Sequence, residues 1–60
     1  MTRKDYQLIA SSILSELRCY DNSTPENSAI KELAQRLSYE LSLDNPRFDT
    51  ARFLTACGVK

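Results

Sequence analysis

The carboxyl-terminal end of the chain constrains the fold most, because it specifies both ends of a short helix. Asp49 is a suitable N-cap residue, since its carboxylate can accept hydrogen bonds from the free backbone N–H groups of a first helical turn. Phe48 and Phe53 stand on either side of this start at the spacing of a hydrophobic staple. Gly58 is the only glycine of the chain and can adopt the left-handed conformation that ends a helix. We therefore expect a helix over residues 50–57.

Two longer stretches upstream have the apolar periodicity of amphipathic helices. The first helix is expected over residues 3–19, with Thr2 as its N-cap. The second is expected over residues 25–43, with Thr24 as its N-cap. Pro25 can occupy the first helical position because that position needs no N–H donor. A start at Ser28 is the alternative. The apolar positions recur three or four residues apart and are Tyr6, Ile9, Ala10, Ile13, Leu14 and Leu17, then Ile30, Leu33, Ala34, Leu37 and Leu41.

These helices predict an all-α protein, a compact three-helix domain formed by residues 1–60. Two long amphipathic helices joined by a short loop pack antiparallel, and the short C-terminal helix is expected to cross their open end. A chain of 60 residues buries only about 60% of the surface of its unfolded form. Its core must therefore be efficient, or a second subunit must add buried surface, and a homodimer stays open as an alternative.

The residue types needed for catalysis or metal binding are scarce. The chain has no histidine, which removes the commonest general base and the imidazole ligand of zinc. Cys19 and Cys57 are far apart and stand at apolar positions, so both are expected to be small buried hydrophobic residues. Gly58 alone cannot form a glycine-rich phosphate loop. These observations favour a non-enzymatic protein without a cofactor, a metal or a small-molecule substrate.

Eight basic and eight acidic residues give the chain a formal net charge of zero. This balance is unlike the strongly basic surface of a dedicated nucleic-acid binder, and we expect a mixed, solvated surface. Glu32 and Arg36 stand four apart and predict an ion pair, whereas Glu40 and Asp44 repel each other at the same spacing. The chain also lacks the apolar run of a signal peptide or a membrane span, so a cytoplasmic location with no membrane partner is expected.

Tyrosines at the edges of the apolar stripes are the candidate interface anchors. Tyr39 combines a large ring with a polar tip, which suits a protein interface, and Tyr20 has the same character. Together with Glu40, Leu43 and Arg47, Tyr39 forms the candidate partner-binding surface.

A helix-turn-helix regulator of DNA is the sharpest alternative, because three helices in this size range suit that motif. Its candidate nucleic-acid contacts are Arg3, Lys4, Arg47 and Arg52. Against it, the third helix is short and largely apolar, with few polar side chains to read bases. Arg52 also stands three residues after Asp49, and a local charge-assisted contact over the helix start is the stronger interpretation of its position. Nucleic acid is therefore a less favoured partner than protein.

The two ends of the chain carry distinctive motifs. Residues 1–6 read MTRKDY, and residues 45–58 read NPRFDTARFLTACG. These segments resemble the opening and closing motifs, MTRKDY and NPRFDxxRFLxACG, of a family of small uncharacterised proteins encoded by tailed bacteriophages. The resemblance covers roughly the outer half of the chain. It implies a phage origin and a location in the bacterial host cytoplasm, and it brings no catalytic residues with it. Thr50 and Ala51 stand where similar sequences more often carry charged residues.

Three functional hypotheses follow. The leading one is a non-enzymatic phage accessory protein that binds a host or phage protein through an exposed helical face. A small DNA-binding regulator is the first alternative. A self-associating structural component is the second, and it predicts an assembly larger than the 6.8 kDa chain.

Overall fold

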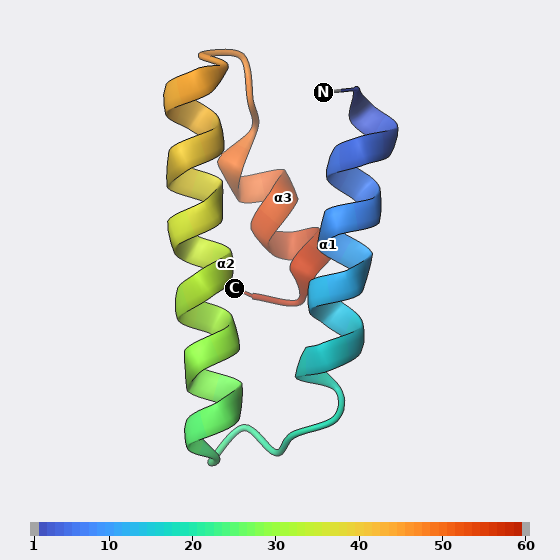
Figure 1. Ribbon diagram of the computed structural model, residues 1–60, viewed down its shortest axis with the longest axis vertical. Helices are drawn as coiled ribbons and strands as arrows, with labels where there is room; N and C mark the ends of the chain where they lie inside the picture. Colours follow the sequence, from blue (N-terminus) through green and yellow to red (C-terminus); the bar gives the residue numbers. More distant parts are fainter. Residues whose placement is uncertain (1, 60) are drawn as a thin grey trace.

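Three helices make up the protein in the computed structural model, which describes residues 2–59 (Figure 1). They are α1 (Arg3–Leu17), α2 (Pro25–Asp44) and α3 (Thr50–Cys57), and this part of the chain contains no strand. α1 and α2 run antiparallel, and α3 crosses behind the space between them in the view of Figure 1. The all-α, three-helix domain expected from the sequence is confirmed, and α2 and α3 have the expected bounds to within a residue.

The first two helices begin at their predicted caps. Thr2 and Asp5 form a capping box at α1, in which the Asp5 N–H donates to the Thr2 hydroxyl at 3.4 Å and the Thr2 N–H donates to the Asp5 carboxylate at 2.9 Å. This backbone hydrogen bond lowers the pKa of the Asp5 carboxyl, because it stabilises the charged form. At α2 the Asn27 N–H donates to the Thr24 hydroxyl at 3.2 Å. The second helix therefore begins before Ser28, and that alternative start is wrong.

α1 ends at Leu17, earlier than the expected boundary at Cys19. Asn27 of α2 supplies a reason, because its buried side-chain amide donates to the Tyr20 carbonyl at 3.2 Å and to the Leu17 carbonyl at 3.5 Å. Carbonyl groups at the end of α1 are thus satisfied from α2 and no longer need a further helical turn. Cys19 lies in the exposed turn that follows, so the expectation that it is buried is wrong.

The start of α3 is fixed by aromatic packing. Phe53 lies in the core and is 5% exposed. Phe48 packs against it with ring centroids 5.3 Å apart, and Tyr6 of α1 packs against Phe48 with centroids 4.7 Å apart. The Asp49 carboxylate accepts from the Arg52 backbone N–H at 3.0 Å. The predicted hydrophobic staple and N-cap are therefore both confirmed, and the staple joins α3 to α1.

The end of α3 closes at Gly58. Its φ of 84° lies in the left-handed region, its N–H donates to the Thr55 carbonyl at 3.0 Å, and the Val59 N–H donates to the Leu54 carbonyl at 2.8 Å. This is a Schellman arrangement, and it confirms the left-handed Gly58 expected at the end of the helix. A Cβ at Gly58 would also lie 2.7 Å from Leu14 Cδ1, so a larger residue would have to displace the Leu14 side chain in addition to adopting a strained backbone conformation.

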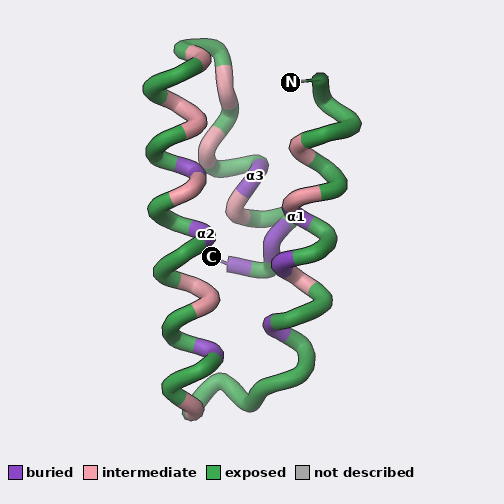
Figure 2. The backbone as a smooth tube through the Cα atoms, in the orientation of Figure 1, coloured by how far each residue is buried: buried purple, intermediate pink, exposed green. Residues whose placement is uncertain are grey.

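The core lies where the three helices meet (Figure 2). Its side chains come from all three helices and from the residue after Gly58. The buried apolar residues are Ala10, Ile13, Leu17, Ala34, Phe53, Cys57 and Val59.

The exposed charges of α2 pair differently from the expectation. Arg36 Nε lies 3.0 Å from Glu40 Oε2, and this is the one ion pair within residues 2–59. The expected Glu32–Arg36 pair is wrong, because Arg36 turns toward the other acidic residue four positions away. Both side chains are exposed, at 74% and 47%, so the pair contributes at most a few tenths of a kcal/mol.

Replacing Phe53 by alanine tests whether α3 holds the fold together. The substitution removes a buried ring, and we expect a loss of about 3 to 5 kcal/mol in the free energy of unfolding, measured by urea denaturation with circular dichroism. Leu8→Ala is the matched control, because Leu8 is 67% exposed and its loss should change stability by no more than about 0.5 kcal/mol. Equal stability of the two variants would show that Phe53 is not packed as described.

Candidate binding surfaces

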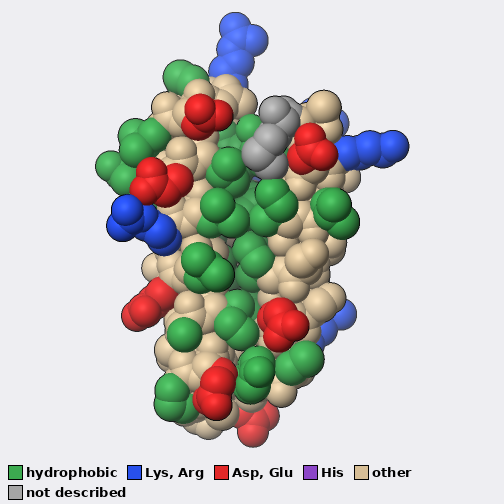
Figure 3. Space-filling model, viewed as in Figure 1, with side chains coloured by type: hydrophobic (Ala, Val, Ile, Leu, Met, Phe, Trp, Pro, Cys, Tyr) green, Lys and Arg blue, Asp and Glu red, His purple; other side chains and the backbone are tan. Residues whose placement is uncertain are grey.

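The two long helices leave one face uncovered. α1, α2 and α3 have 15, 20 and 8 residues, so α3 is only about 12 Å long against about 22 and 30 Å. It packs against both long helices from one side. No third element lies over the opposite side within the described residues, which is the face seen in Figure 3.

Helical spacing shows which side chains reach this uncovered face. On α2, Asn27 and Lys31 lie beside Gly58 at the end of α3. Because successive residues are turned by about 100°, Leu33 and Leu37 point away from that side. By the same helical geometry, the Ile9 side chain of α1 points away from α3. We call Ile9, Ile30, Leu33 and Leu37 the open strip.

The open strip is a continuous apolar surface. Leu33 is 60% exposed, and the other three residues of the strip are half-buried against the core. Figure 3 shows hydrophobic side chains running down the middle of this face, along the seam between α1 and α2. Exposed apolar surface that is contiguous in this way is a candidate interaction site.

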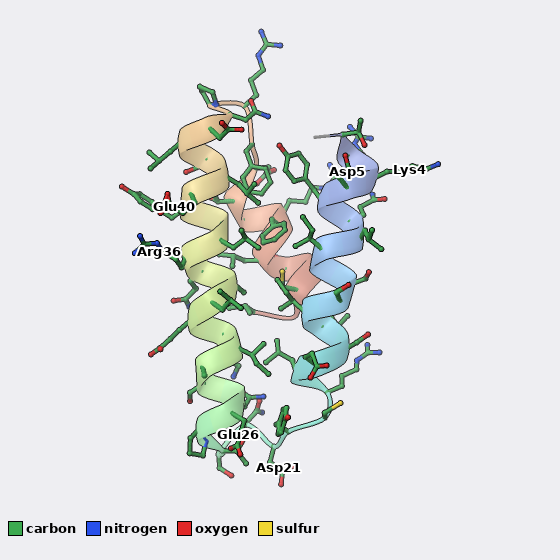
Figure 4. All side chains as sticks on the ribbon, in the orientation of Figure 1. Lys4, Asp5, Asp21, Glu26, Arg36 and Glu40 are labelled. Atoms are coloured by element: carbon green, nitrogen blue, oxygen red, sulfur yellow. The ribbon has the colours of Figure 1, made fainter. Side chains whose placement is uncertain are left out.

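Acidic side chains border the open strip. Glu26 and Glu40 each stand seven residues from Leu33, so they lie on the same line of α2 two turns away. Asp5 stands four residues before Ile9 on α1, and Figure 4 shows it at the upper end of that helix. Figure 3 shows acidic groups on both sides of the apolar seam and basic groups mainly at the margins.

The α3 side of the molecule is basic instead. Two surface hollows lie there, with volumes of about 480 and about 320 Å³. Asp49 is the acidic residue of the larger hollow and Asp21 that of the smaller. The basic residues that line the hollows are Arg3, Arg47 and Arg52 in the larger, and Arg18 and Lys31 in the smaller. The basic residues at the two hollows therefore outnumber the acidic ones by five to two, whereas the face in Figure 3 carries both signs, with the acidic groups nearer the seam.

The predicted partner-binding residues are only partly brought together. Tyr39 and Leu43 are 57% and 61% exposed on the outer side of α2, next to Glu40, which is held by its pair with Arg36. Arg47 lies elsewhere, because the chain turns after α2 and places it at the larger hollow.

The residues of the nucleic-acid alternative are gathered more closely. Arg3, Arg47 and Arg52 all line the larger hollow, although they come from α1, the connection between α2 and α3, and α3. Lys4 is outside that hollow, and Figure 4 shows it projecting away from the body of α1.

Sequence reasoning missed the open strip because Leu33 belongs to the same apolar stripe as the core residues. The expected helices could nevertheless have predicted an uncovered face. A single third helix over residues 50–57 can lie on only one side of the two longer helices and must leave the other side uncovered.

Metal-binding clusters and membrane-spanning helices were sought within residues 2–59. Residues 2–59 contain no cluster of three or more cysteine, aspartate or glutamate side chains suited to a metal ion. Within the same residues, none of the helices is both long and apolar enough to cross a bilayer. Cys57 is buried, and this burial raises the pKa of its thiol, which lowers its nucleophilicity at neutral pH.

Comparisons of the chain with protein-family models, with curated proteins and with solved structures give no match. Function is therefore inferred from the geometry and charge of the two faces and from the motifs at the ends of the chain.

The two thiols should differ sharply in reactivity. Cys19 is exposed and should react at once with an aromatic disulfide reagent in the native protein, whereas buried Cys57 should react only as the protein unfolds. Absorbance of the released thiolate gives the count directly. In Cys19→Ser the rapid phase should vanish, and a rapid phase of unchanged size in that variant would contradict the burial of Cys57.

Proposed function

We propose that the protein is a non-enzymatic bacteriophage accessory protein that binds a host or phage protein through the open strip. The single observation that carries this proposal is the exposure of Leu33, 60%, within an apolar seam that no element of residues 2–59 covers. The phage origin is supported by the MTRKDY and NPRFDTARFLTACG motifs. A bacterial cytoplasm is the compartment in which such a protein would act.

The proposed partner element is an amphipathic helix with basic flanks. A seam between two packed helices accepts a third helix by the same ridge-and-groove packing that joins the first two. Of the acidic border residues, Glu26 and Asp5 form no ion pair within residues 2–59 and would meet lysine or arginine on the incoming helix, whereas Glu40 is already paired with Arg36. Such borders would disfavour an acidic partner helix. Glu40 stands on the same line of α2 as Leu33, whereas Leu43 and Tyr39 are turned about 80° and about 120° away from Leu33, toward the outer side of α2, and do not extend the open strip.

The size of the molecule limits how many partners it engages on this face. Its accessible surface is 4596 Å², and a standard interface occupies about 800 Å² on each partner. One partner protein at a time is therefore expected on the open strip.

A second copy of the chain is a poorer occupant, because a two-fold interface would place the acidic borders of both copies together.

Replacing Leu33 by glutamate tests this surface without touching the core. Leu33→Glu should weaken partner binding by at least about tenfold, or about 1.4 kcal/mol, because it places a charge at an apolar contact. Leu8→Glu is the matched control, since Leu8 is equally exposed on α1 and lies outside the strip. Wild-type, Leu33→Glu and Leu8→Glu proteins would each serve as bait in affinity capture from infected cells.

A partner protein should be recovered with the wild-type and Leu8→Glu baits and lost with Leu33→Glu. Recovery of the same proteins by all three baits, or of none above background, would contradict it. Sedimentation gives an independent result. A wild-type mass well above 6.8 kDa that falls in Leu33→Glu would identify the occupant as a second copy, the self-associating alternative.

A further inference from the structure

The larger hollow on the α3 side is a second candidate site, separate from the open strip. Its three arginines come from segments far apart in the sequence, so the fold itself gathers them. We call this site, lined by Arg3, Arg47 and Arg52, the arginine hollow. Its volume of about 480 Å³ falls within the range of about 300 to 1,000 Å³ that small-molecule sites occupy.

The charge of the arginine hollow is not balanced by the protein. Three arginines face one acidic residue, Asp49, whose carboxylate is engaged by the Arg52 backbone N–H at 3.0 Å. The one ion pair within residues 2–59 lies on α2, away from the hollow. Gathered cations without carboxylate partners favour a bound anion, and guanidinium groups bind phosphate with two parallel hydrogen bonds.

Aromatic rings form part of the wall beside these arginines. Tyr6, Phe48 and Phe53 all line the hollow, and the first two are only half-buried, so part of each ring remains accessible. Their mutual packing, with centroids 4.7 and 5.3 Å apart, holds the rings in place. A positively charged groove with fixed aromatic rings is the arrangement by which proteins bind unpaired nucleotides, with phosphates on arginine and bases on the rings.

We propose that the arginine hollow binds a nucleotide unit, either free or within single-stranded nucleic acid. The site is concave, and α3 is packed against both long helices with Phe53 and Cys57 buried. A duplex hides its bases and offers no unpaired ring to enter a hollow, so single strands should be preferred. This inference is independent of protein binding on the open strip, since the two sites occupy opposite faces.

A fluorescein-labelled thymidine oligonucleotide is the probe, and its anisotropy is measured with the full chain. Arg3→Gln and Arg52→Gln should each weaken binding by about fivefold or more, since each removes a phosphate contact. Lys4→Gln is the matched control, because it makes the same charge change at the neighbouring position outside the hollow. It should change the affinity by less than about twofold. Arg52→Gln keeps the backbone N–H that completes the cap at Asp49.

Salt dependence gives a second readout. With three phosphate contacts, the logarithm of the affinity should fall with the logarithm of salt concentration at a slope of about −2, and Arg3→Gln should make that slope shallower by about 0.7. Leu33→Glu should bind the oligonucleotide as the wild type does, so failure of the open strip and failure of the arginine hollow give different results. Circular dichroism melting of every variant confirms that each is folded.

Competition separates the sources of the nucleotide. Displacement of the probe by thymidine monophosphate at comparable concentrations would assign a free nucleotide, and displacement only by unlabelled oligonucleotide would assign a strand. Four results would overturn the proposal: no anisotropy change at about 100 μM protein and about 50 mM salt, equal weakening by Lys4→Gln, binding of duplex as tight as single strand, or equal displacement by polyglutamate. The last would show that any acidic polymer satisfies the arginines.

Discussion

The packing of α3 against α1 and α2 is the interaction on which the rest of the structure depends. Phe53, Cys57 and Val59 come from α3 and its end, and they are among the most buried residues of the protein. Without them, the buried side chains of the long helices would face water, because those helices meet chiefly around α3. The staple at Phe48 and the closure at Gly58 fix the two ends of α3, so local sequence rules position the residues that complete the core.

The position of α3 on one side of the helix pair also creates both candidate binding surfaces. Eight residues are enough to cover one side of the helix pair, and the other side keeps the open strip with Leu33 exposed. On the covered side, α3 does not fill the space evenly, and hollows remain at both of its ends. Acidic residues border the strip and basic residues line the hollows, so a chain of zero net charge presents two electrostatically different faces.

The sequence predicted well those features that depend on neighbours along the chain. The caps at Thr2, Thr24 and Asp49 were predictable because each involves side chains within a few residues of a helix start. The exposure of Cys19 was not predictable, because the side-chain amide of Asn27, which belongs to another helix, ends α1. The partner of Arg36 could not be predicted either, because acidic residues stand four positions away from it in both directions.

The candidate sites show the same limit. Arg3, Arg47 and Arg52 were recognisable as basic residues, but their meeting at one hollow depends on how α3 crosses α1. Arg47 was also expected beside Tyr39, and the turn after α2 separates them. Leu33 could not be distinguished from core residues by periodicity, because exposure is decided by which side α3 covers.

Amide hydrogen exchange measured by NMR tests the central claim most directly. If α3 is an integral part of the core, the amide of Val59, which donates to the Leu54 carbonyl at 2.8 Å, should exchange only through global unfolding. Its opening free energy should then equal that of Ile13 in α1. Exchange of Val59 near the rate of an unstructured peptide, with α1 and α2 still protected, would contradict the account.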